Sequence, residues 1–105
     1  MKYVALSLLA ISVGCLSEYD ATMRSLNAEI AVLDRLEREK AGLIVKRETA
    51  LSAIDALELP ISEELTSKQE IIAITLPQIT EVQSEIDKQV VRVQLLKRKR
   101  DMLSD

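Results

Sequence analysis

Several residue types on which functional sites commonly depend are missing or rare in this chain of 105 residues. His, Trp and Phe are absent, and Tyr3 and Tyr19 are the only aromatic residues. Without histidine, the chain lacks the commonest general base and the commonest metal ligand. Two aromatic residues are too few for a surface that stacks nucleic-acid bases. We therefore expect no enzyme activity, no metal or other cofactor, and no nucleic-acid binding.

Glycine, proline and cysteine are also rare, with two, two and one residues respectively. Such a composition excludes collagen-like and disulfide-stabilised folds, and the length allows one small domain at most. Hydrophobic residues make up 48% of the chain and charged residues 30%, with a formal net charge of −3. This balance is not that of an intrinsically disordered chain.

The first fourteen residues have the layout of a bacterial export signal. Lys2 gives a positive start, an uncharged and mostly apolar run of eleven residues extends from Val4 to Gly14, and Cys15 follows directly. A helix that spans a membrane needs about 20 apolar residues, so this run is short for a permanent span. We therefore predict a signal peptide over residues 1–14. An apolar helix buried in an assembly is the alternative.

Cys15 is the only cysteine, so no disulfide can form within the chain. The stretch Ser12-Val13-Gly14-Cys15 resembles the lipobox of bacterial lipoproteins, in which the cysteine is acylated and becomes the first residue after cleavage. Ser12 departs from the family, which usually carries Leu there, and the stretch also fits ordinary signal-peptidase cleavage after Gly14. The resemblance implies lipidation of Cys15 and attachment to a membrane through that lipid.

The rest of the chain predicts an all-α fold with two long helices. Ala, Leu, Glu, Arg and Lys dominate residues 18–58, and these residue types favour helix. Pro60 ends this segment, and Ser62 is the expected N-cap of a second helix over about residues 63–103. The turn is thus expected at residues 59–62. Pro77 lies inside the second helix and is expected to kink it.

Apolar residues recur at spacings of three and four, as in a seam between paired helices. In the first helix the stripe drifts from Leu36 onward, which predicts a phase shift there, and Lys40 and Arg47 interrupt it. In the second helix the expected seam residues are Leu65, Ile72, Leu76, Ile79, Val82, Ile86, Val90, Val93, Leu96 and Leu103. We predict an antiparallel helical hairpin or coiled coil over residues 15–105. A single extended rod is the alternative.

Charge favours the hairpin, because the two arms carry opposite net charges. Residues 15–64 hold 11 acidic and 6 basic side chains, whereas residues 65–105 hold 6 acidic and 7 basic ones. A two-helix hairpin has one narrow seam and buries little apolar surface, so small folds of this kind usually need a partner. We therefore expect an oligomer, or a protein partner bound through helical seams.

A basic cluster near the C-terminus is the candidate binding surface. Its residues are Arg92, Lys97, Arg98, Lys99 and Arg100. Such a cluster can contact anionic lipid headgroups or nucleic acid, and the shortage of aromatic residues and the net negative charge disfavour nucleic acid. The alternative is that these cations only complement the dipole at the end of the helix.

Together these features predict an exported, lipid-anchored helical protein that acts as a spacer, tether or assembly subunit of a bacterial envelope. Leu16 and Ser17 follow the cysteine, and the sorting pattern of enterobacterial lipoproteins then implies the outer membrane, facing the periplasm. The alternative is an unprocessed structural component of a larger particle, such as a phage virion or a secretion machine. In that case the apolar N-terminus would pack against neighbouring subunits.

Overall fold

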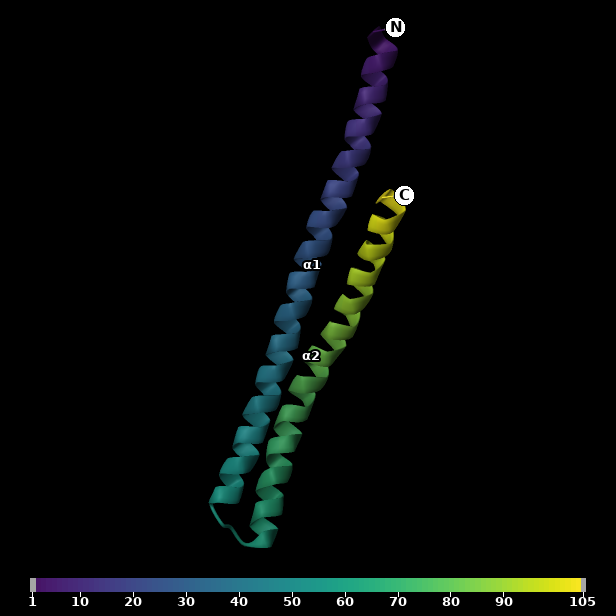
Figure 1. Ribbon diagram of the computed structural model, residues 1–105. Coiled ribbons are helices and arrows are strands. Elements are labelled where there is room, and N and C mark those ends of the chain that lie inside the picture. The colour runs from purple at the N-terminus through teal and green to yellow at the C-terminus, as the bar shows by residue number, and fades with distance from the viewer. Residues whose placement is uncertain (1, 105) are drawn as a thin grey trace. The chain divides into compact units, whose positions relative to one another are not determined.

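The computed structural model describes the backbone of residues 2–104 and the side chains of residues 18–104. Two helices, α1 (Lys2–Ala56) and α2 (Ile61–Ser104), make up this part of the chain apart from the turn between them, and it contains no strand (Figure 1). The predicted all-α fold, with two long helices paired as an antiparallel hairpin, is confirmed. The side chains of the predicted signal peptide (1–14) and of Cys15 lie outside the described part.

The first helix ends two residues earlier than predicted, at Ala56. Glu58 has a φ of 49°, and this left-handed conformation cannot continue a right-handed helix. The N–H groups of Leu57 and Glu58 donate to the carbonyls of Ile54 and Asp55 at 3.2 and 3.4 Å. These short-range bonds tighten the last turn before the chain leaves the helix.

The second helix begins at Ile61, before the predicted N-cap. The carbonyl of Pro60 accepts the first bond of this helix from the N–H of Glu64 at 2.9 Å. Proline suits this place because it needs no hydrogen-bond partner for its nitrogen. Ser62 is therefore inside α2 rather than at its N-cap, and the turn covers residues 57–60 instead of 59–62.

Contacts group the chain into two units. Unit 1 combines the part of α1 up to Val32 with the part of α2 from Gln89 onward, and unit 2 covers Leu33–Lys88. In each unit a segment of α1 runs antiparallel to a segment of α2 (Figure 1). Each unit therefore has its own seam between two helical segments.

The seam of unit 1 contains both apolar and polar side chains. Leu26 is 1% exposed and Val93 5%, while the polar residues Thr22 and Gln89 are 3% and 4% exposed. The hydroxyl of Thr22 has a hydrogen-bond partner within its own helix, because it donates to the carbonyl of Glu18 at 2.9 Å. The predicted seam residue Val93 is thus confirmed as buried. Polar residues that the apolar pattern did not single out lie beside it.

On α1, the seam of unit 2 has no phase shift. Its members alternate in steps of three and four residues, the repeat of a regular seam. These members, all buried or half-buried, are Leu33, Leu36, Lys40, Leu43, Arg47, Ala50 and Ile54. The predicted phase shift at Leu36 is wrong, because Lys40 and Arg47 belong to the seam rather than interrupt it.

On α2, the seam of unit 2 agrees with the sequence prediction only from Ile79 onward. Its buried or half-buried members include Ile71, Thr75, Ile79, Val82 and Ile86. The predicted members Leu65, Ile72 and Leu76 are 55%, 37% and 52% exposed and lie outside it. Ile71, Thr75 and Ile79 follow one another in two successive steps of four residues across Pro77. Before Pro77, the seam therefore lies one residue earlier than a regular alternation of three and four would place it. The helix runs unbroken through Pro77, and a kink there stays a prediction.

Candidate functional site

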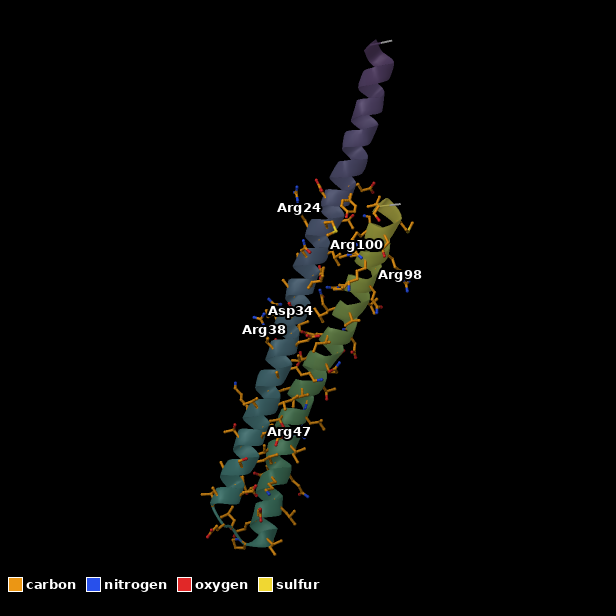
Figure 2. The ribbon with its side chains drawn as sticks, viewed as in Figure 1. Arg24, Asp34, Arg38, Arg47, Arg98 and Arg100 are labelled. Carbon is orange, nitrogen blue, oxygen red and sulfur yellow. The ribbon has the colours of Figure 1, made fainter. Side chains whose placement is uncertain are left out.

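The structure divides the basic cluster of α2 between different sides of the helix. Arg92, Lys97, Arg98 and Lys99 are exposed, whereas Arg100 is half-buried. Figure 2 shows Arg98 on the side of α2 that points away from α1, and Arg100 on the side toward α1. The guanidinium of Arg100 pairs with the carboxylate of its neighbour Asp101 at 3.1 Å. Arg100 is therefore oriented away from the surface on which Arg98 lies.

Apolar side chains share the outer face of α2 with Arg98. Val91 is 54% exposed, Leu95 57% and Met102 79%. Positions 91, 95, 98 and 102 follow one another in steps of four, three and four, so they align along one face of the helix. With the two cations beside it, we call this face the outer stripe of α2: Val91, Arg92, Leu95, Arg98, Lys99 and Met102.

The outer stripe is cationic as well as apolar. Arg92 lies three residues before Leu95 and Lys99 four residues after it, so both cations neighbour Leu95 on the helix surface. The only acidic residue between positions 91 and 102 is Asp101, whose carboxylate is bound by Arg100. No carboxylate of this segment therefore neutralises the three cations of the stripe.

A buried polar pair joins the two helices of unit 1. The side-chain amide of Gln89 donates to the backbone carbonyl of Glu29 at 2.9 Å and also to the Glu29 carboxylate. Gln89 is 4% exposed and Glu29 is half-buried. A polar pair inside a helical seam fixes the alignment of the helices, because a shifted alignment would bury both groups without partners.

Replacing Gln89 by Leu is expected to lower the free energy of unfolding by about 1–3 kcal/mol, because the half-buried Glu29 carboxylate loses its donor. Urea unfolding followed by circular dichroism measures this change. The double variant Glu29→Leu/Gln89→Leu is the control and should recover most of the stability, since an apolar pair leaves no unsatisfied group. If Gln89→Leu alone were as stable as the wild type, the pair would have no energetic role.

In unit 2, the polar seam residue Lys40 is already paired. Its ammonium group donates to the side-chain carbonyl of Gln83 at 2.5 Å, and the Gln83 amide donates to Asp87 at 2.9 Å. A shallow depression of about 350 Å³ next to this network is lined by Lys40, Ile79, Thr80, Gln83, Ser84 and Asp87. Ligand sites are usually deeper and mostly apolar, with a few converging polar groups. The network therefore suits alignment of the two helices better than ligand binding.

An ion-pair network lies near the turn of unit 2. The ammonium group of Lys68 lies 2.5 Å from the carboxylate of Asp55 and 3.0 Å from that of Glu64. The hydrogen bond with Lys68 lowers the pKa of Asp55 below its ordinary value. The hydrogen bond with Asp55, followed by one with Glu64, raises the pKa of Lys68. These directions favour the charged forms that link the end of α1 to the start of α2.

Unit 2 exposes more large apolar side chains than it buries. Three of its apolar residues are buried, namely Leu36, Val82 and Ile86. Eight large ones are exposed, at Ile44, Val45, Leu57, Ile61, Leu65, Ile72, Ile74 and Leu76. Four of these form what we call the second stripe of α2, because their steps of four, seven and four place them on one helix face: Ile61, Leu65, Ile72 and Leu76. Exposed apolar patches of this kind mark interaction surfaces.

Among the described side chains, no group of three or more His, Cys, Asp or Glu residues is arranged to hold a metal ion. Every buried polar atom of these side chains has a hydrogen-bond partner. A search of the described residues for a helix with the length and apolar character of a membrane span found none. Comparisons with protein-family models, with curated proteins and with solved structures gave no match.

Proposed function

We propose that the protein is an exported, lipid-anchored helical protein that acts as a tether or assembly subunit of a bacterial envelope, at the outer membrane and facing the periplasm. The observation that carries this proposal is the position of Cys15, directly after Gly14 and an apolar run. Lipid on this cysteine would attach the chain to a bilayer, and the hairpin that follows would carry the contacts with other proteins.

The pairing within unit 1 supports a location of the basic segment near such an anchor. Glu29 lies opposite Gln89, as their hydrogen bonds require. Cys15 precedes Glu29 on α1 and Arg100 follows Gln89 on α2, at helical rises of about 21 and 17 Å respectively. Because the helices are antiparallel, both displacements run in the same direction. The basic segment of α2 would then lie within about 5 Å, along the helix axis, of the level of Cys15.

The exposed apolar side chains of unit 2 support the assembly role. The second stripe of α2 (Ile61, Leu65, Ile72 and Leu76) is 37–77% exposed. Burying a large apolar side chain contributes about 1.5–3 kcal/mol, so a helix packed on this stripe would add substantially to stability. A second copy of the chain or another helical protein can supply that helix. Unit 2 is therefore the proposed site of protein contacts.

The intact mass of the native protein, extracted from membranes with detergent, tests the proposal. We expect a chain that has lost residues 1–14 and gained the mass of acyl groups on Cys15. A chain that starts at Cys15 without acyl mass would support export and exclude the lipid anchor. Neither outcome depends on how the helices pack.

The exposed apolar side chains also fit the second candidate, an unprocessed structural component of a larger particle. Eleven large apolar side chains of the described part are exposed, and neighbouring subunits of a particle would cover them. For this role we expect an intact mass that still includes residues 1–14. The same measurement therefore separates the two functions.

A further inference from the structure

We propose that the outer stripe of α2 binds an anionic lipid surface. Val91, Leu95 and Met102 would contact the boundary between headgroups and acyl chains, and Arg92, Arg98 and Lys99 would contact the headgroups. The inference extends the proposed membrane attachment, yet it needs no lipid on Cys15. It assigns to the folded chain a second contact with the bilayer.

Exposure and charge together point to lipid. The three apolar side chains are 54–79% exposed, because the seam is formed by the opposite face of the same helix. A helix that lies in a membrane interface buries such an apolar line by about 5–10 Å and places its cations at the headgroups. Each cation near an anionic leaflet adds attraction. The outer stripe combines both features and holds no carboxylate.

A second copy of the chain fits the outer stripe less well. In a two-fold symmetric contact the same patch faces itself. Such a contact would bring Arg98 and Lys99 of one copy toward the same residues of the other, and like charges in an interface are unfavourable. Arg98 also divides the apolar line between Leu95 and Met102. Helix-on-helix packing on this line would bury a cation that no carboxylate of the stripe neutralises.

The direction of the stripe determines how unit 1 would lie on the membrane. Positions 91 to 102 extend along the helix by about 17 Å. Contact along this length sets the helical pair of unit 1 parallel to the bilayer surface instead of perpendicular to it. The attraction of the three cations is screened by salt, whereas the contribution of the apolar side chains remains.

The test uses the full chain with Cys15→Ser, so that lipid on Cys15 has no part in binding. A single cysteine introduced as Leu95→Cys carries an environment-sensitive fluorophore, and Lys97→Cys carries it in the control. Lys97 is exposed like Leu95, but a step of two residues places it about 160° away from Leu95 around the helix. The vesicles contain either phosphatidylglycerol or phosphatidylcholine alone.

We expect the probe at position 95 to move into an apolar environment on phosphatidylglycerol vesicles and the probe at position 97 to stay in water. Equal responses at both positions, or no response at either, would overturn the proposal, because attachment through the N-terminal apolar run alone does not orient α2. A response at position 95 that depends on protein concentration without vesicles would also overturn it, since the stripe would then be a contact between copies.

The charge contribution is measured with Arg98→Gln/Lys99→Gln in the same labelled background. Half-saturation should need roughly fivefold more anionic lipid for each cation removed at low salt. Arg38→Gln/Lys46→Gln is the matched control, because both residues are exposed but belong to unit 2. An equal loss of binding in the control would show that total charge, and not the outer stripe, attracts the chain. That result would overturn the assignment.

Discussion

Replacing Leu26 by Asp is expected to destabilise unit 1 by about 4 kcal/mol or more, because it buries a charge without a partner. Leu26 is 1% exposed and is the most deeply buried large side chain of the described part. Its neighbours in the seam, Thr22 and Gln89, already bond to other groups. Neither side chain is positively charged, so neither can form an ion pair with the new carboxylate. Loss of helical signal on heating, followed by circular dichroism, measures the effect.

Ala28→Asp is the matched control for this substitution. Ala28 is exposed on the same helix, only two residues away. The new carboxylate there stays in water, and only the lower helix propensity of Asp remains, at most about 0.7 kcal/mol. Equal melting temperatures for Leu26→Asp and the wild type would mean that the seam of unit 1 contributes little to stability.

The hairpin could be predicted from the sequence because its causes are local. Residues that favour helix fill both arms, and Pro60 is the strongest break between them. The position of the turn could be predicted only to within two residues. The left-handed backbone of Glu58 decides where α1 ends, and a Glu gives no sign of that conformation in the sequence, as a Gly would.

The seam could be predicted only where its residues are apolar. Val82, Ile86 and Val93 are buried as expected. Lys40, Arg47 and Gln89 are also seam residues, and their type suggested exposure. Their spacing was the available signal, because each lies three or four residues from its apolar neighbours on the seam. Long aliphatic stems let Lys and Arg occupy such positions with their charged ends near water.

The exposed part of the candidate site could not be predicted from the run of basic residues alone. Consecutive residues on a helix are turned by about 100°, so Lys97, Arg98, Lys99 and Arg100 cannot share one face. Only the position of the seam shows which of them point outward. It also shows that Leu95 lies outside the seam and beside the cations.

The complete loss of acylation is the largest effect that we expect from a single substitution, and Cys15→Ser should cause it. The lipobox resemblance implies that acyl transfer requires the thiol, so a serine hydroxyl cannot replace it. Ordinary cleavage after Gly14 is then expected to produce a chain without a lipid anchor, since Ser12-Val13-Gly14 also has the small residues of a signal-peptidase site. This chain should move largely to the soluble fraction, with only the reversible contact of the outer stripe of α2 left to hold it at a membrane. Labelling with radioactive palmitate and separation of membrane and soluble fractions measure the two effects.

Ser12→Leu is the matched variant that should raise acylation instead of abolishing it. It introduces the residue that the lipoprotein family usually carries at this position, so the acylated fraction should rise while Cys15 is unchanged. Ser17→Ala lies beyond the cleavage site and should leave labelling as in the wild type. If palmitate does not enter the wild-type chain, the lipid anchor is wrong, and any membrane attachment must come from the apolar run or from the outer stripe of α2. Because that stripe is a feature of the folded chain, its binding to anionic vesicles would persist in Cys15→Ser.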